Sequence, residues 1–378
     1  MKRQTLVVGS LVAALIGVVS LFIGLLVEPS RAWFAYLAAW TFGVTVCVGA
    51  LLLVMVGHAS KGSWMLVTLR PAEAIVGALP VFALLFIPIA FGLREIYPWV
   101  DHPDPHKAHY LSRGFFIART VLYFVVFIGI GSLLRLWSRR NDEAPSLARV
   151  LRMRRLSGGG LPLVALTFTW ASFDWTMSLY PHWWSTIFGL YYFAGAFIAA
   201  VALVSIVLYV PAFGVGALVH ATPDHAQALG RVLFAMVAFW AYMAFSQLLI
   251  IWIANIPAEV TFFGDRTRGS WTGLTYVLVC GQFVAPFFLL LNRQWKRRGD
   301  YLALVSAWLF MMHYIDVYWL VLPAHDVRGV QPDWMDVAAI LFVGGVSCAW
   351  IARRWAGAPP LPRHAPALAE GLSYEAAL

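Results

Sequence analysis

Two aspartates lie within otherwise apolar segments of this chain, and each stands seven residues before a proline. Asp174 precedes Pro181, and Asp316 precedes Pro323. A carboxylate near the middle of a bilayer costs about 2.5–3.5 kcal/mol on insertion scales and rarely faces lipid. Burial and charged neighbours can move the pKa of a carboxyl group towards neutrality, which suits it to proton transfer. The repeated spacing therefore marks both acids as candidate proton carriers.

Both acids have polar neighbours at helical spacing. His313 lies three residues before Asp316, so the imidazole and the carboxylate can meet or share a water molecule. Around Asp174, small and polar residues recur on one helical face: Thr167, Ala171 and Ser178. The competing interpretation is structural, in which these groups form hydrogen bonds between helices and fix their packing.

Further polar residues lie near the ends of the predicted helices. On the predicted inner side these are His58, Lys61, Arg70 and Glu73. Arg70 and Glu73 can also form an ion pair at a helix start, where Pro71 suits the first turn. Another helix carries Tyr242 and Ser246 one turn apart, and Glu259 follows near its outer end. We therefore predict a proton route with these members: His58, Glu73, Asp174, Tyr242, Ser246, Glu259, His313 and Asp316.

The composition determines which elements must hold these residues. The chain has 378 residues, of which 61% are hydrophobic and 12% charged, with a mean hydropathy of +0.76. Such values are typical of a polytopic membrane protein and exclude a soluble domain. Ten apolar stretches are long enough to cross a bilayer as helices: 6–27, 33–56, 73–93, 115–137, 161–180, 186–209, 229–254, 271–291, 301–322 and 334–351.

The basic residues predict the orientation. With the N-terminus inside, most of the 27 Lys and Arg fall in the inner segments, which predicts that both termini are cytoplasmic. This asymmetry explains the net charge of +9, and no nucleic-acid partner is needed. A bacterial inner membrane is the location implied by the family resemblance of the motifs described below. The inner loop 138–160 contains a basic amphipathic segment that we expect to lie on the lipid surface and to end at Gly158–Gly160.

The spacing of the two acids predicts an internal repeat. Asp174 is on the fifth helix and Asp316 on the ninth, so helices two to five match helices six to nine in the same orientation. We expect one membrane domain over residues 1–355, with four-helix bundles at about 33–180 and 186–322, flanked by helices one and ten. Residues 356–378 are rich in proline, and we predict a disordered cytoplasmic tail there. Pro80 and Pro88 should bend the third helix.

The sequence gives little support for a cofactor held by this chain. Cys47, Cys280 and Cys348 are isolated within helices, so we expect them to be small core residues. A b-type haem needs two facing axial ligands, and only His313 lies well inside a helix. The outer loop 101–109 holds histidines and aspartates, but its spacing matches no common zinc site. We expect no metal there, and docking to an extracytoplasmic partner is the better explanation of this loop.

Several segments together resemble a known family. They are Trp64 with Arg70-Pro71-Ala72-Glu73, His106 with His109-Tyr110-Leu111 and Arg119, Ser172-Phe173-Asp174-Trp175, and Tyr242–Gln247 running into Trp252–Glu259. This set is similar to the NrfD-like family, the membrane subunits of polysulfide reductase. Within that family the chain looks most like the ActF-type subunit of bacterial alternative complex III. The resemblance covers about residues 5–355.

The resemblance implies a role in a larger assembly. Family members have two four-helix bundles beneath extracytoplasmic subunits that carry iron–sulfur clusters and haem c. Alternative complex III oxidises quinol and passes electrons to a cytochrome c or a similar carrier. The expected partners are a sister NrfD-like subunit with the quinol site, iron–sulfur and multihaem cytochrome subunits, small membrane-anchored subunits and lipids. Asp174 would match the family's helix-embedded acid, and this chain would contribute a proton path without redox cofactors of its own.

Three alternatives stay open at this point. The chain could itself bind quinol, with Asp174 accepting a proton beside His182 and Tyr180. It could be an unrelated solute transporter, although no matching pair of unwound helices appears in the two halves. It could also be a structural anchor whose acids only pack.

Overall fold

The computed structural model describes residues 3–210, 220–355 and 359–376. Helices make up 82% of the structure, and no strand occurs among these residues. Ten helical spans are long and apolar enough to cross a membrane: 4–27, 29–60, 63–91, 113–143, 147–179, 188–209, 223–254, 269–289, 299–324 and 334–355. These findings confirm the predicted all-α membrane protein with ten spans.

Eight spans are built on single long helices: α1 (Arg3–Val27), α2 (Pro29–Ser60), α6 (Arg113–Glu143), α7 (Leu147–Trp175), α8 (Phe188–Tyr209), α9 (Pro223–Ala254), α14 (Gly299–Val321) and α15 (Trp334–Trp355). The third span comprises η1 (Ser63–Met65), α3 (Leu66–Val76) and α4 (Leu79–Phe91). The eighth comprises α11 (Gly269–Leu278), a π-helical turn η6 (Val279–Val284) and α12 (Ala285–Leu289). Shorter elements connect them: α5 (Leu93–Ile96), η2 (Pro98–Val100), η3 (Met177–Leu179), α10 (Pro257–Arg266), α13 (Arg293–Lys296), η7 (Leu322–Ala324) and α16 (Leu368–Leu372).

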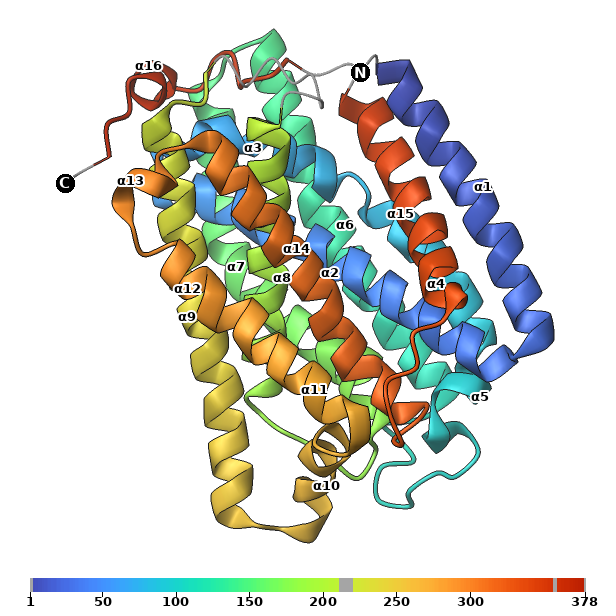
Figure 1. The fold of residues 1–378 in the computed structure, drawn as a ribbon. Coiled ribbons are helices and arrows are strands. Elements are labelled where there is room, and N and C mark those ends of the chain that lie inside the picture. Colours follow the sequence, from blue (N-terminus) through green and yellow to red (C-terminus); the bar gives the residue numbers. More distant parts are fainter. Residues whose placement is uncertain (1–2, 211–219, 356–358, 377–378) are drawn as a thin grey trace.

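The spans form two groups of four that pack alike. In the first group, α2 contacts α3, α4 and α7, and α6 contacts α4 and α7. In the second group, α8 contacts α9 and α14, while the eighth span contacts α9 and α14. These pairings of the first group thus have their counterparts in the second. The two groups meet where α2 packs against α8 and α14 (Figure 1).

The first and tenth spans lie outside these bundles. α1 packs along α15, and α15 in turn contacts α2 and α3. The start of α1, the end of α15 and α16 lie at one end of the molecule, which we call the terminal face, and α10 lies at the opposite face (Figure 1). Much of α1 stays exposed and apolar, as expected for a helix surrounded by lipid.

The third span is broken where its sequence predicts a bend. α3 ends before Gly77, and α4 begins with Pro80 in its first turn. The carbonyl of Gly77 at this break accepts a hydrogen bond of 2.7 Å from Trp350 Nε1, so α15 satisfies this acceptor. The helix also starts earlier than expected, because Pro71 lies inside α3 and not in its first turn.

The expectation of a separate surface segment before Gly158 was wrong. α7 runs without interruption from Leu147 to Trp175, through all three glycines. Gly160 lets α7 pack closely on α2, because a Cβ there would lie 3.0 Å from Met55 Cε. Close packing of α7 on α2 therefore outweighs the weak helix preference of glycine.

The C-terminal segment also departs from the prediction of a disordered tail. Residues 359–376 cross the terminal face and include α16. Asn141 Nδ2 donates to the carbonyl of His364 at 3.2 Å, and the imidazole of His225 contacts the carbonyl of Gly371 at 2.9 Å. Proline holds a segment extended and leaves its carbonyls free, so polar groups at the helix ends can fix it. Residues 356–358 and 377–378 of the predicted tail lie outside the described residues.

The cysteines are only partly where we expected them. Cys47 is buried between helices, but Cys280 and Cys348 are exposed on the surface of the chain. The sequence could not separate these cases, because lipid-facing and core positions of a membrane helix are equally apolar.

Candidate functional site

Asp174 is fully buried and forms a bidentate ion pair. It lies in the last turn of α7, and Arg119 on α6 reaches both of its oxygens, with Nε–Oδ2 2.8 Å and Nη2–Oδ1 2.9 Å. Tyr123, one turn further along α6, donates to Oδ2 at 2.6 Å. The guanidinium also lies 3.8 Å from the ring centroid of Tyr110. An arginine fork of this kind neutralises a buried carboxylate and sets its geometry.

Asp316 is buried in the second bundle and has uncharged partners. Tyr191 on α8 donates to Oδ1, and Trp240 Nε1 on α9 donates to Oδ2 at 3.2 Å. No cationic side chain forms an ion pair with this carboxylate among the residues that the structure describes. A proton can therefore bind to or leave Asp316 without breaking a salt bridge.

His313 lies one turn before Asp316 and is almost fully buried. Its Nε2 is 2.9 Å from the hydroxyl of Thr45 on α2, and this hydroxyl also donates to the carbonyl of Phe42 at 2.8 Å. Because the hydroxyl has one proton, Nε2 must be the donor, which leaves Nδ1 as the free acceptor of a neutral imidazole. Nδ1 has no hydrogen-bond partner.

The imidazole of His313 and the carboxylate of Asp316 both lie next to Gly195 of α8. A Cβ placed on Gly195 of α8 would lie 3.0 Å from His313 Nδ1 and 3.2 Å from Asp316 Oδ2. The two groups make no direct hydrogen bond, so of the two predicted arrangements, direct contact or a shared water molecule, direct contact is absent. The missing side chain of Gly195 leaves this space between an acceptor nitrogen and a titratable oxygen.

A third polar cluster lies at the terminal face. Arg70 on α3 donates to Glu73 Oε2 at 2.7 Å, to Ser138 Oγ at 3.0 Å and to Asp142. The predicted pair of Arg70 and Glu73 is therefore present, and Asp142 at the end of α6 joins it. Glu73 Oε1 and His58 Nε2 are buried without partners, so both can bind water.

The remaining predicted residues lie apart from these clusters. Tyr242 is 63% exposed on α9, and Ser246 is half-buried one turn below it. Glu259 is half-buried in the first turn of α10, at the opposite face. Among the described residues, no hydrogen bond joins the Glu73 cluster to either buried aspartate. The predicted members thus form separate clusters and no continuous chain.

Tyr242 instead lines a large cavity beside Asp316. The cavity holds about 630 Å³ between α9, α10, α14 and the eighth span. Its wall is mostly apolar, but Tyr191 and Trp240, the two residues that hold Asp316, also belong to it. The π-helical turn η6 borders the cavity and widens its helix there.

Arg266 supplies a buried cation at the edge of this cavity. It is fully buried, and it donates to the carbonyls of Trp319 and Leu320 at 3.0 and 2.9 Å. Its guanidinium lies 3.5 Å from the ring centroid of Phe262. Burial lowers the pKa of this side chain from its ordinary value.

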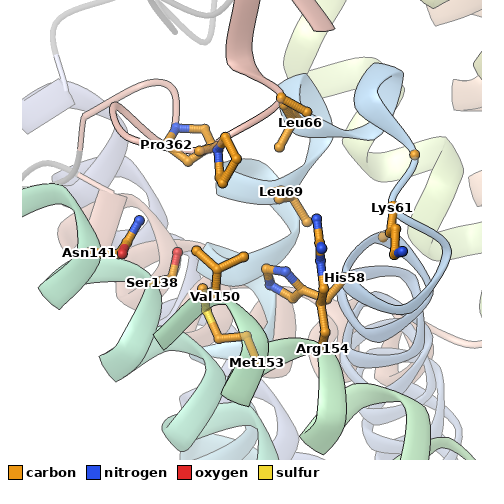
Figure 2. Close-up of a pocket in the computed structure, with 15 residues that line it drawn as sticks. His58, Lys61, Leu66, Leu69, Ser138, Asn141, Val150, Met153, Arg154 and Pro362 are labelled. Carbon is orange, nitrogen blue, oxygen red and sulfur yellow. The ribbon is translucent and has the colours of Figure 1, made fainter. Parts of the chain in front are cut away.

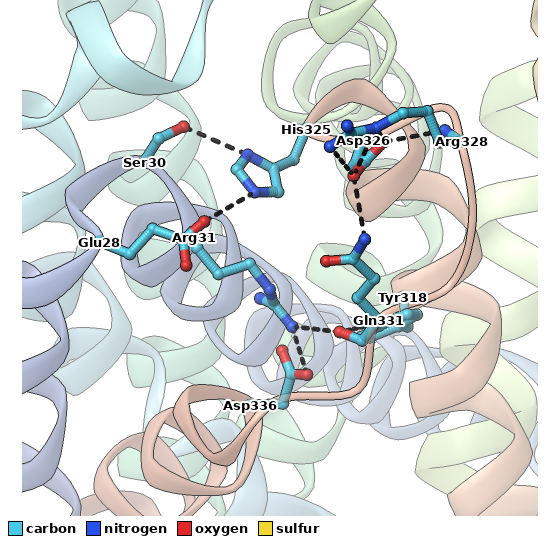
Figure 3. A network of polar contacts seen from close by, with 9 residues as sticks. All are labelled: Glu28, Ser30, Arg31, Tyr318, His325, Asp326, Arg328, Gln331 and Asp336. Atoms are coloured by element: carbon cyan, nitrogen blue, oxygen red, sulfur yellow. Dashed lines mark hydrogen bonds and ion pairs between the residues drawn. The ribbon is translucent and has the colours of Figure 1, made fainter.

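At the opposite face, a polar network ties the start of α2 to the connection between α14 and α15 (Figure 3). Arg31 pairs with Asp336 and donates to the carbonyl of Gln331 at 3.2 Å. His325 Nδ1 contacts Ser30 Oγ at 3.2 Å, and its Nε2 lies 3.9 Å from Glu28. This network fixes a connection between spans, and it contains none of the predicted route residues.

The sequence analysis did not predict the partners of the two aspartates as site residues. Arg119 lies in the outer half of an apolar helix, and a buried carboxylate needs a countercharge, so the sequence did contain a signal. Tyr191 and Trp240 gave no such signal, because aromatic residues in an apolar helix are ordinary core residues.

No protein-family model matches this chain, and no curated protein matches it in sequence.

Proposed function

We propose that this chain is a membrane subunit of a quinol-oxidising electron-transfer complex, of the NrfD-like, ActF type, and that it moves protons coupled to quinol oxidation. The observation that supports this most directly is the environment of Asp316: a fully buried carboxyl group with two uncharged donors, beside a histidine with a free acceptor nitrogen. Carboxyl and imidazole groups of this kind are suited to passing protons.

The two aspartates then have different roles. Asp316 and His313 exchange protons, whereas Asp174 is held by Arg119 and stabilises the first bundle. Glu73 and His58 supply protons at the terminal face, where their unpaired atoms can bind water. Movement of protons through the apolar layer between the clusters requires a second arrangement of the helices, which a partner subunit's redox change would favour.

A quinol site within this same chain is the second candidate. It is favoured by the cavity of about 630 Å³, because its wall contains both donors to Asp316. A quinol ring lying there would reach Asp316 through the Tyr191 hydroxyl. Asp174, His182 and Tyr180, the residues that the sequence suggested for such a site, do not line this cavity, although the Tyr180 ring lies 4.9 Å from the guanidinium of Arg266 at its edge.

The test uses the whole complex in sealed proteoliposomes. We would replace Asp316 and Asp174 separately by asparagine, and record quinol oxidation and proton release. The matched control is Asp300→Asn, because Asp300 is an exposed acid in the first turn of the same helix as Asp316.

On the proton-route proposal, Asp316→Asn keeps electron transfer and loses a large part of the proton release, while Asp300→Asn changes neither. Loss of quinol oxidation itself in an assembled complex, together with weaker quinol binding in Ala241→Trp, which narrows the cavity, supports the quinol site instead. Normal activity and normal proton release in Asp316→Asn would refute both functions for this group and leave the structural anchor. Transport of a solute by the chain alone in liposomes would support the transporter.

A further inference from the structure

A small cavity opens at the terminal face beneath the C-terminal segment (Figure 2). It holds about 70 Å³, which exceeds the space of two water molecules at about 30 Å³ each. Its walls come from the end of α2, the start of α3, the end of α6 and the first turns of α7. Pro362 and the segment 365–367 close it from above.

The polar groups of this cavity are mainly cationic or hydrogen-bond donors. Lys61 and Arg154 both line it, and no aspartate or glutamate does so among the described residues of its wall. His58 also lines it, and its Nε2 is buried with no hydrogen-bond partner. Ser138 adds a hydroxyl. A partly open space lined by two cations and an unpaired imidazole nitrogen, with no acid in its described wall, favours an anion.

The geometry points to a phosphate group as the ligand: we propose that this cavity binds a phosphate, carried by an anionic lipid headgroup or free in solution. A guanidinium and an ammonium together suit the several oxygens of a phosphate, and the imidazole can donate to a third. The volume accommodates a phosphate group, and the opening of the cavity leaves room outside it for the rest of a lipid headgroup.

The position of the cavity agrees with this ligand. The charge asymmetry predicts that the terminal face is the cytoplasmic one, where anionic lipids gather. Arginines around the start of α7, such as Arg152 and Arg155, are exposed on the same surface. The cavity lies beside the end of α2 and the first turns of α7, close to these exposed arginines. The proposal does not depend on proton movement by the chain.

The test measures binding to the full chain purified in a neutral detergent. Inorganic phosphate is titrated by calorimetry, and phosphatidylglycerol and phosphatidylcholine are offered separately and counted by native mass spectrometry. The variants are Arg154→Ala and Lys61→Gly. Lys61 has a φ of 56°, so glycine removes its ammonium group without straining the backbone. The matched control is Arg152→Ala, which removes an exposed arginine of the same helix that does not line the cavity.

Each cavity variant should weaken binding by about tenfold or more, because each removes one charge-assisted contact. Arg152→Ala should leave the affinity within about twofold of the original. Binding of inorganic phosphate that competes with the lipid identifies a free anion site, and binding of phosphatidylglycerol alone identifies a lipid headgroup site. The proposal is overturned if neither ligand binds saturably, or if Arg152→Ala weakens binding as much as Arg154→Ala.

Discussion

Asp174 and Asp316 occupy similar positions in their helices but have different partners. Arg119 neutralises Asp174, whereas Asp316 has only a phenol and an indole as donors. Removing one member of a buried ion pair leaves an uncompensated charge, but a carboxyl group with neutral donors can gain a proton in place. The first acid therefore suits a structural role and the second a role in proton exchange.

The first prediction concerns the ion pair between Arg119 and Asp174. Arg119→Met should destabilise the chain by about 3–5 kcal/mol, because Asp174 then stays buried without its countercharge. Adding Asp174→Asn should restore part of this loss, because the double variant buries no charge. Thermal unfolding in detergent of the single variants and the double variant gives the coupling between the residues. Additive losses would show that the pair is not coupled in this way.

The second prediction concerns Gly195, which lies beside His313 and Asp316. A Cβ at this position would lie 3.0 Å from His313 Nδ1 and 3.2 Å from Asp316 Oδ2, so Gly195→Ala must displace one of these groups. We expect a stability loss of about 1–3 kcal/mol and reduced proton release at unchanged assembly of the complex. Thermal unfolding and the proteoliposome assay measure the two effects.

The control for this substitution is Gly129→Ala on α6. A Cβ at Gly129 would meet no atom within 4 Å, so the variant should be neutral or more stable by up to about 1 kcal/mol. Equal behaviour of the two alanine variants would mean that the space beside Gly195 is not constrained.

At the scale of elements, the helices could be predicted and their partners could not. Length, hydropathy and prolines locate ten spans and the break in the third, because these depend on local composition. The donors to Asp316 are Tyr191 and Trp240, which lie 125 and 76 residues away in the chain. Such pairings depend on how α8, α9 and α14 pack, and periodicity contains no information about which faces meet. The continuous α7 was missed for the same reason, since Gly160 is fixed by its contact with α2.

The third prediction is that the stability of the connection between α14 and α15 depends on pH. Burial lowers the pKa of His325 from its ordinary value of 6.5, and the nearby Arg31 acts in the same direction, while Glu28 and Asp326 oppose them. Arg328 also lowers it. The unfolded state therefore binds a proton more readily than the folded state. The stability of this connection should be complete above about pH 6.5 and should be lost as the pH falls towards the folded-state pKa.

Hydrogen exchange of the backbone amides at 325–333, compared at pH 7.5 and pH 5.5, would measure this effect. Faster exchange at the lower pH is expected beyond the intrinsic rate change. His325→Gln should remove the difference. Asp326 does not interfere, because hydrogen bonds from Arg328 lower its pKa to about 2 and it stays ionised throughout this range. A pH effect that persists in His325→Gln would contradict the role of this imidazole.

At the scale of the whole molecule, the positions of the polar groups define two unlike faces. The terminal face carries the Arg70 cluster, the small cationic cavity and the C-terminal segment, whereas the opposite face carries the Arg31 network and α10. Asp316 and His313 lie between them within α14. The direction of any proton movement therefore depends on which face is cytoplasmic.

The last prediction concerns this orientation. Most of the basic residues lie on the terminal face, so the positive-inside rule places this face in the cytoplasm. A green fluorescent protein fused to the C-terminus should fluoresce, and alkaline phosphatase fused there should be inactive, because it folds only outside. Alkaline phosphatase inserted in the loop 101–109 should be active, since this loop belongs to the opposite face. The reverse pattern would place Glu73 and His58 outside, and it would reverse the proposed direction of proton uptake. It would also move the cationic cavity away from the cytoplasmic leaflet, so that a free anion and not an inner-leaflet lipid would be its expected ligand.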